Sequence, residues 1–303
     1  NPKMDVTSIG DINLDAITSK LKELPEKDSQ RVVSDLSLSS GGCAANFAKA
    51  ISKLGLETRF IGKMGDDVIG EFLRNSMEGV DLVLSKGSKS GITFAMVFED
   101  DTRSFVTYPG SNGEFTIGDI NLDLIEGKYL HVGSFFLQGL REDTKKVLDH
   151  AHGRGMSTSF DTGWDPAGWC KEDITLVREI LKGVDIFFPN LKEGEAITGA
   201  KGREKVCEEL LALGPQIIAL KLGSEGSYIA NGKERISIPP TKVDVVDTTG
   251  AGDVFDASFV YGHSKGWDLE KVGKFANAAA ALSTRDYGSN GYPAPDDVNS
   301  ILQ

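Results

Sequence analysis

The alternation of strand-like and helix-like segments is the feature of this sequence that most restricts its fold. Runs rich in β-branched and aromatic residues predict strands at 4–9, 58–62, 128–134, 156–161, 184–190 and 216–223. Apolar residues at three- and four-residue spacing predict helices at 43–54, 67–77, 142–153 and 203–213. The C-terminal part is predicted to be mainly helical, from 252 to 283 and again at 296–302. Alternating strands and helices imply right-handed crossovers, so we expect an α/β fold with a mostly parallel sheet covered on both faces.

Two segments interrupt this alternation and predict a second, small sheet. Residues 14–39 fit neither pattern, and residues 91–110 contain two β-type runs joined by a turn at 99–101. A small sheet inserted at these places is expected to act as a lid over the carboxyl edge of the main sheet, where open α/β folds bind ligands. With 303 residues and 40% hydrophobic content, the chain is expected to form one domain, 1–303, with the lid inserted at about 14–39 and 91–110.

The charge and cysteine content exclude several classes of partner. A formal net charge of −12 disfavours binding to DNA, RNA or an anionic membrane, because these reward clustered lysine and arginine. No leader-like start and no apolar run of about eighteen residues is visible. Cys43, Cys170 and Cys207 lie far apart, which favours a reducing compartment over a disulfide framework or a zinc site. We therefore expect a cytoplasmic protein with no nucleic-acid partner and no membrane partner.

A glycine-rich turn stands where a strand-like run passes into a helix, in VDVVDTTGAGDVFDASFVYG at 243–262. Gly250 and Gly252 let the backbone approach a ligand closely, and the free N–H groups of a helix start attract an anion. Asp253 is placed to accept a proton from a substrate hydroxyl while those N–H groups stabilise a phosphoryl group. Alone, the pattern also fits a tight turn with an aspartate that offsets the helix dipole. An acid beside an anion site favours phosphoryl transfer.

This string resembles the C-terminal signature of the ribokinase (PfkB) family of carbohydrate kinases. Residues 41–73, GGCAANFAKAISKLGLETRFIGKMGDDVIGEFL, are similar to the N-terminal signature of the same family. The two motifs occur in the right order, and the resemblance covers nearly the whole chain, including the small sheet. It implies a ribokinase-like three-layer αβα fold. It also implies an ATP-dependent kinase that, with Mg²⁺, moves the γ-phosphoryl group to a hydroxymethyl group of a small ribose- or fructose-like carbohydrate.

The resemblance assigns roles to the residues of the phosphate and nucleotide sites. Asp253 is the implied general base, and the implied anion hole is Gly250, Ala251 and Gly252. Glu193 is implied to organise Mg²⁺ and phosphates through water, although a glutamate in a first helical turn is common without that role. The implied nucleotide-binding residues are Asn190, Lys221, Gly223, Gly226 and Asn277. Asp247 matches a residue near the monovalent-cation loop of many members, which leaves K⁺ as an open additional ion.

The hexapeptide GDINLD occurs at 10–15 and again at 118–123, and the two copies predict different roles. The first copy follows the strand at 4–9, which places Asn13 and Asp15 at the carboxyl end of a central strand, where ligands bind. The resemblance implies that these two side chains hold sugar hydroxyls, since carboxylates accept charge-assisted hydrogen bonds. It implies that the sugar site is completed by Gly41, Gly42 and Asn46.

The second copy leads toward the strand at 128–134 and predicts a helix start. Asp119 is predicted to be the N-cap of that helix, with Ile120 and Leu124 turned toward the core. In the copy at 118–123, the sequence GDINLD therefore indicates a structural role.

Two departures from the family pattern bear on the substrate. Cys43 stands where ribokinases usually carry lysine, and SFDTGWDP at 159–166 lacks the arginine of the family's Asp-x-Asn-x-Arg pattern. Some nucleoside kinases of the superfamily have a comparable Asp-x-Gly segment, so a nucleoside kinase is the alternative. Trp164 in this segment either stacks on a sugar or base or packs in the protein.

Three further questions concern function class and assembly. An NAD-dependent oxidoreductase is a remote alternative, because no G-x-G-x-x-G follows the first strand. A catalytically silent sugar-binding protein is another remote alternative, but it would not need Asp253 and Glu193. Exposed sheet faces tend to be covered, so a homodimer through the lid and a monomer are both left open.

Overall fold

The predicted alternation forms a nine-stranded sheet within residues 3–303, the part of the chain that the computed structural model describes. The strand order is β13-β12-β11-β10-β9-β8-β1-β4-β5. The strands are β1 Val6–Ile9, β4 Thr58–Gly65, β5 Asp81–Gly87, β8 Tyr129–Gly133, β9 Ser157–Asp161, β10 Ile186–Phe187, β11 Ile217–Lys221, β12 Ser227–Ala230 and β13 Arg235–Ile238. The seven strands from β11 to β5 pair in parallel, whereas β12 and β13 pair antiparallel at one edge. The prediction of a mostly parallel sheet is therefore confirmed.

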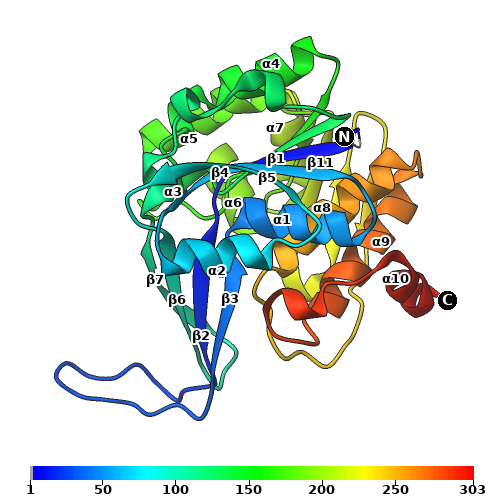
Figure 1. The fold of residues 1–303 in the computed structure, drawn as a ribbon. Helices are drawn as coiled ribbons and strands as arrows, with labels where there is room; N and C mark the ends of the chain where they lie inside the picture. The colour runs from blue at the N-terminus through cyan, green and yellow to red at the C-terminus, as the bar shows by residue number, and fades with distance from the viewer. Residues whose placement is uncertain (1–2) are drawn as a thin grey trace.

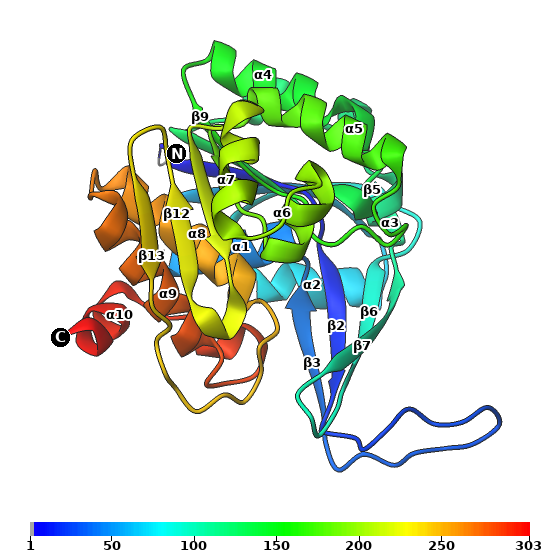
Figure 2. The same cartoon turned by 180° about the vertical axis from the view of Figure 1, so that it is seen from behind.

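Helices cover both faces of this sheet, as the opposite views in Figures 1 and 2 show. The helices of one face are α1 Cys43–Lys53, α2 Val68–Ser76, α8 Ala251–Ser264, α9 Leu269–Ser283 and α10 Pro295–Leu302. Those of the other face are α4 Thr144–Gly153, α5 Lys171–Ile180, α6 Leu191–Thr198 and α7 Arg203–Ala212. The predicted helical stretch 252–283 is two helices, because the chain turns between α8 and α9. Within residues 3–303, none of the helices is long and apolar enough to cross a bilayer.

The packing explains why the central strands contain few exposed positions. Every residue of β1 and β8 is buried, so their apolar side chains enter the core on both faces of the sheet. On the α1 face, Phe47 is fully buried and its ring stacks on His131 of β8, with ring centroids 3.8 Å apart. Burying a side chain of this size contributes roughly 1.5–3 kcal/mol to the free energy of unfolding. Burial lowers the pKa of His131 to about 3, so this imidazole is a neutral part of the core.

The second sheet has four strands in the order β3-β2-β6-β7. They are β2 Asn13–Thr18, β3 Leu36–Gly41, β6 Gly91–Val97 and β7 Arg103–Tyr108. Residues 19–35, between β2 and β3, run out as a long loop away from the main body (Figure 1). Asn13 and Asp15 therefore belong to the small sheet itself, on a strand that three residues separate from the end of β1. Of the predicted domain 1–303, residues 1–2 lie outside the described residues.

The second GDINLD copy contains the end of one short 3-10 helix, Ile117–Asp119, and the start of another, Leu122–Leu124, so the predicted N-cap at Asp119 is wrong. Thr116 is the N-cap of the helix Ile117–Asp119, and Asp119 is its third residue. The Asp119 carboxylate accepts a hydrogen bond from the Thr116 N–H at 3.0 Å and also pairs with Lys63 of β4. Ile120 is buried as predicted, whereas Leu124 is only partly buried. Thr116 supplies the cap because its backbone is already extended, while Asp119 has entered the helical turn.

Candidate active site

The N-terminus of α8 lies at the centre of the predicted site residues. Its N-cap, Gly250, has a φ of 81°, and a Cβ there would lie 2.9 Å from the Tyr292 hydroxyl, so the position requires glycine. Gly252 has room for a Cβ, which would meet the Lys221 ammonium at 3.5 Å, an ordinary contact distance. The Ala251 N–H already donates to the Thr248 carbonyl oxygen at 3.2 Å. The first turn of α8 thus retains N–H donors for an anion mainly beyond Ala251.

Asp253 lies in this first turn and is buried. One of its carboxylate oxygens accepts a hydrogen bond from the Asn46 side-chain amide at 3.0 Å. Burial raises the pKa of Asp253 to about 7, and the nearby Asp161 carboxylate adds to this effect, while Asn46 and Lys221 oppose it. A carboxylate with a pKa near neutrality can hold and release a proton during a reaction at pH 7.

Asp253 shares its surroundings with two carboxyl groups that the sequence predictions did not assign. Asp161 ends β9 and Asp256 lies one helical turn after Asp253, and one oxygen from each of the three groups lies within 4.8 Å of the others. The Lys221 ammonium, at the end of β11, donates to Asp161 at 2.7 Å and to Asp256 at 3.1 Å. The side chain of Lys221 therefore points into this buried carboxylate cluster. The sequence showed Asp161 at the end of a predicted strand, but it did not show that Asp161 lies next to Lys221.

The predicted sugar residues gather where β2 and β3 meet α1. The Asn13 amide donates to Asp15 at 2.8 Å, and Asn13 pairs in register with Gly41 of β3. A Cβ on Gly41 would lie 2.1 Å from an Asp15 oxygen, so the strand can approach Asp15 only without a side chain. Burial raises the pKa of Asp15 to about 7, helped by the Asp11 carboxylate. The Asn46 side-chain oxygen is buried and has no hydrogen-bond partner within the described residues.

Asp11, Lys49 and Tyr292, which were not predicted from the sequence, surround the predicted sugar-binding residues. The Asp11 carboxylate accepts the Ala44 N–H at 3.0 Å, which ties the strand connection to the first turn of α1, where Gly42 turns the chain with a φ of 96°. The Lys49 ammonium donates to the Ser40 carbonyl oxygen at 3.1 Å and lies 5.7 Å from the centre of the Tyr292 ring. Burial lowers the pKa of Lys49 to about 8. One sequence signal could have identified Lys49. It lies three residues after Asn46 on α1, so the two side chains lie on the same side of the helix.

Asn190 and Glu193 form a reciprocal cap at the start of α6. The Asn190 side chain accepts the Glu193 N–H at 2.8 Å, and the Glu193 carboxylate accepts the Asn190 N–H at 2.9 Å. Glu193 is buried, and burial together with the Asp161 charge raises its pKa to about 7, against the influence of Lys221. The cap agrees with the alternative expectation for Glu193, a structural role in the first turn of a helix. It also places a carboxylate within the electrostatic reach of the Asp161 and Lys221 pair.

Two of the predicted nucleotide-side residues, Gly226 and Asn277, contact the chain at the end of β13. Gly223 and Gly226 bound the turn between β11 and β12, with φ values of 58° and 89°. A Cβ on Gly226 would lie 2.0 Å from the Ile238 carbonyl oxygen, while Gly223 has open space around it. The Asn277 amide of α9 donates to the Pro239 carbonyl oxygen at 3.0 Å. Segments far apart in sequence therefore meet at one edge of the sheet.

Asp247 connects the glycine-rich turn to the loop that follows α9. Its two carboxylate oxygens accept the N–H groups of Thr249 at 2.9 Å and Gly288 at 3.1 Å. Arg103, on β7 of the small sheet, donates to the Thr249 hydroxyl at 3.1 Å. The small sheet thus contacts the segment that leads directly into Gly250.

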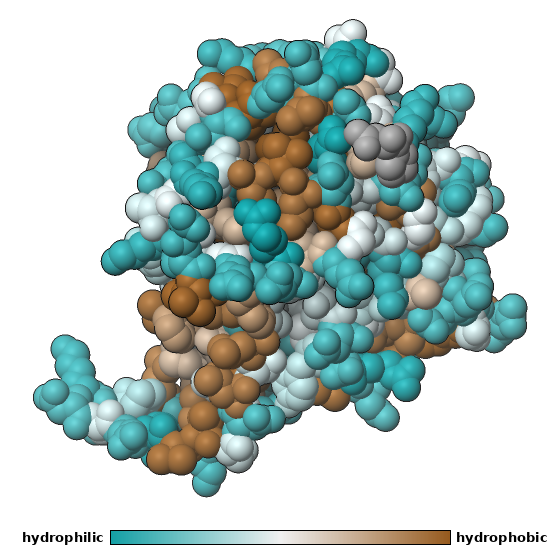
Figure 3. Space-filling view, viewed as in Figure 1, coloured by the Kyte–Doolittle hydropathy of each residue, from teal (hydrophilic) through white to brown (hydrophobic). Residues whose placement is uncertain are grey.

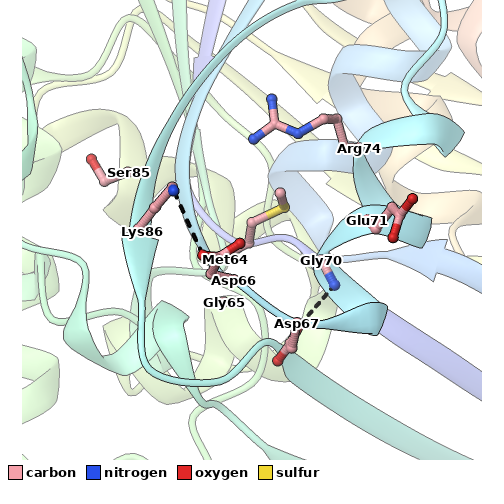
Figure 4. A pocket seen from close by; sticks show the side chains of 9 residues that line it. All are labelled: Met64, Gly65, Asp66, Asp67, Gly70, Glu71, Arg74, Ser85 and Lys86. Atoms are coloured by element: carbon pink, nitrogen blue, oxygen red, sulfur yellow. Dashed lines mark hydrogen bonds and ion pairs between the residues drawn. The ribbon is translucent and has the colours of Figure 1, made fainter.

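A cavity of about 360 Å³ lies apart from these residues, between α2 and β5 (Figure 4). Its lining is Met64, Gly65, Asp66, Asp67, Gly70, Glu71, Arg74, Ser85 and Lys86. Lys86 pairs with Asp66 at 3.6 Å, and both side chains are exposed. This lining contains none of the predicted site residues, so the cavity adds nothing to the arrangement around Asp253.

The chain has relatives along nearly its whole length. The profile of the pfkB family of carbohydrate kinases matches residues 3–297. An uncharacterized sugar kinase of Archaeoglobus fulgidus is 34% identical over 248 residues, which cover 79% of this chain and 96% of that protein. The structure of an uncharacterized sugar kinase of Pyrococcus horikoshii in complex with ATP is 30% identical, with a TM-score of 0.80 over 98% of this chain and 100% of the other. The ribokinase of Thermotoga maritima is 27% identical, with a TM-score of 0.83 over 99% of both chains. The predicted ribokinase-like fold is confirmed.

Proposed function

Because the chain belongs to the pfkB family of carbohydrate kinases, we propose that Asp253 is its general base in phosphoryl transfer from ATP. The acceptor in this proposal is a hydroxymethyl group of a small ribose- or fructose-like carbohydrate. The observation that carries the proposal is the Asn46 side chain. Its amide donates to Asp253, while its buried oxygen has no partner among residues 3–303. A buried amide oxygen without a donor costs free energy, so a substrate hydroxyl that donates to it would be bound beside the base.

The acceptor hydroxyl would be oriented by polar groups on both sides of Asn46. Asn13 and Asp15 would hold the remaining sugar hydroxyls, and Gly41 and Gly42 would keep the backbone close to the ring. The Asp253 carboxylate would then take the proton of the attacking hydroxyl as the new O–P bond forms and the bond to the ADP oxygen breaks.

The phosphoryl group would be stabilised by the start of α8. Gly250 ends the preceding loop in a left-handed conformation, and Gly252 presents no side chain toward the space above Lys221. N–H groups of a first helical turn point away from the helix and attract negative charge. The anion hole would thus be made by Gly250, Ala251 and Gly252, with the Ala251 N–H shared with Thr248.

The nucleotide would lie along the edge formed by Asn190, the segment from Lys221 to Gly226, and Asn277. Glu193 would hold Mg²⁺ through bound water molecules. Mg²⁺ would neutralise negative charge on the phosphates. The Asp247 oxygens keep lone pairs after accepting two N–H groups, so they also fit K⁺ as an additional ion.

The small sheet would act as the lid of this site and as the contact surface of a homodimer. Arg103 already links it to Thr249. Register places Leu38, Ala16, Phe94 and Val106 in one row across β3, β2, β6 and β7, and all of them except the buried Ala16 are more than half exposed. Figure 3 shows hydrophobic side chains gathered on this sheet. An exposed apolar sheet face of this kind is commonly covered by a partner.

A panel assay tests the proposed substrate class. ADP formation would be measured with ATP and Mg²⁺ against pentoses, hexoses, inositol and nucleosides, with product checked by ³¹P NMR. We expect phosphorylation of a pentose or hexose at a hydroxymethyl group. Turnover with nucleosides alone would favour the nucleoside kinase alternative and contradict the proposed acceptor.

A further inference from the structure

We propose that Lys221 is a positioning residue, which ties Asp161 to Asp256 beneath the first turn of α8 and thereby fixes the place and charge environment of Asp253. This inference rests on the proposed role of Asp253 and assigns Lys221 a different role from direct nucleotide binding. It concerns the side chain alone, because the backbone after Lys221 still leads into the glycine turn at 223–226.

The contacts of the Lys221 ammonium join three elements of the fold. It donates at 2.7 Å to Asp161 at the end of β9 and at 3.1 Å to Asp256 on α8, while its own backbone ends β11. A Cβ on Gly252 would lie 3.5 Å from the same ammonium, so Lys221 lies directly beneath the proposed phosphoryl site. Two strand ends and the catalytic helix are therefore held together by one cation.

The burial of these groups argues against a lysine that leaves to bind a phosphate. The exposed fractions of the side chains are 17% for Lys221, 6% for Asp161 and 1% for Asp256. Removing the cation would leave the buried Asp161 carboxylate without its ion-pair partner and Asp256 without a hydrogen-bond donor, which is strongly unfavourable. One oxygen of Asp256 already has no hydrogen-bond partner in residues 3–303. The Lys221 ammonium is therefore needed at this position as the partner of the two buried carboxyl groups.

The charges around Asp253 explain how Lys221 affects the protonation of this proposed base. The Lys221 ammonium holds the pKa of Asp161 well below its usual range, while burial raises the pKa of Asp256 far above its own. These opposite shifts favour the ionised form of Asp161 and the protonated form of Asp256, and Lys221 offsets the charge of Asp161. The titratable groups that face Asp253 are Asp11, Cys43, Lys49, Asp161, Lys221, Asp256 and Tyr292. Without Lys221, the uncompensated Asp161 charge would favour the protonated form of Asp253, which cannot act as a base.

The matched variants are Lys221→Met, which keeps the length of the side chain, and Lys221→Arg, which keeps its charge. For Lys221→Met we expect the acid limb of the kcat/KM pH profile to move at least about one pH unit upward, which is about tenfold in activity at a pH below the limb. Lys221→Arg should restore the limb toward its original position. The dissociation constant for ATP, measured by calorimetry, should stay within about twofold in both variants, since no phosphate contact is lost.

Asp161→Asn provides an independent test if Lys221→Met does not fold. It removes a negative charge beside Asp253, so the acid limb should move downward, opposite to the effect of Lys221→Met. An unmoved limb in Asp161→Asn, or weaker ATP binding with an unmoved limb in Lys221→Met, would overturn the positioning role. These results differ from a failure of the proposed function, which would appear as near-normal turnover in Asp253→Asn.

Discussion

The side-chain amide of Asn46 lies 3.0 Å from a carboxylate oxygen of Asp253, although 207 residues separate them in the chain. The contact is possible because α1 and α8 pack side by side on the same face of the main sheet. It joins the element that follows the small sheet to the element that starts with the glycine-rich turn. In the proposed function, acceptor binding and phosphoryl transfer would therefore meet at this one hydrogen bond.

Replacing Asn46 with alanine should weaken acceptor binding more than nucleotide binding. Loss of one or two hydrogen bonds to a buried hydroxyl corresponds to about a 10–100-fold increase in KM for the acceptor, with KM for ATP nearly unchanged. Steady-state kinetics with each substrate varied in turn measures this difference. Asn75→Ala on α2 is the control, since that side chain is exposed and should leave both constants unchanged. Equal increases in both KM values would contradict the assignment.

Gly252→Ala should separate stability from activity. The added methyl group has no neighbour closer than 3.5 Å, and alanine is favoured over glycine within a helix by about 1 kcal/mol, so Tm should rise or stay constant. The same methyl group would crowd the phosphoryl group, and kcat should fall by about 10²-fold or more.

Two other glycine variants serve as controls for that experiment. Gly153→Ala at the end of α4 also has open space around it and should raise stability without affecting kcat. Gly250→Ala should lower Tm, since its φ of 81° and the Tyr292 hydroxyl at 2.9 Å disfavour a side chain. Full activity in Gly252→Ala would remove this position from the anion hole.

The ligand-free protein should become less stable as the pH rises from about 5.5 to 8. The pKa values of Asp15, Glu193 and Asp253 are each raised to about 7 in the fold. Between their unfolded and folded pKa values the native state binds more protons than the unfolded state, so stability falls with rising pH in this window. His131, with a pKa lowered to about 3, opposes this trend below about pH 6.5, but it is one group against three. Lys49, with a pKa lowered to about 8, has its opposing effect only above that pH.

Differential scanning calorimetry at pH 5.5 and pH 8 measures this dependence. Asp253→Asn should reduce the difference in Tm between the two pH values, since it removes one of the buried carboxyl groups. A wild-type protein that gains stability across this interval, or a variant with an unreduced difference, would contradict the raised pKa of Asp253.

Local patterns were sufficient to predict the main architecture but not all of its edges. Every segment predicted as a main-sheet strand contains a strand in the structure, since these central strands are rich in buried β-branched and aromatic residues. The edge strands β5 and β13 were not predicted, and neither was β12, which is buried but only four residues long. Edge strands are half exposed, and their patterns are weaker. The N-cap at Asp119 was wrong because Thr116, three residues earlier, has the extended backbone that a cap needs.

The motifs predicted which residues gather near the site but not how they contact one another. The proximity of Asn46 and Asp253 depends on the packing of α1 against α8, which no local pattern contains. The same limit explains why Asp161 and Asp256 were not assigned. Their closeness to Lys221 arises from the order of β9 and β11 in the sheet and the position of α8 above them.

The most direct measurement of the central claim is single-turnover phosphoryl transfer by Asp253→Asn, with ATP and the acceptor identified in the panel. Asparagine keeps the shape of the side chain and cannot accept the proton. We expect unchanged dissociation constants for both substrates and a rate of transfer lowered by about 10²–10⁴-fold, the range of a general base. A folded variant that transfers the phosphoryl group at nearly the wild-type rate would contradict the account.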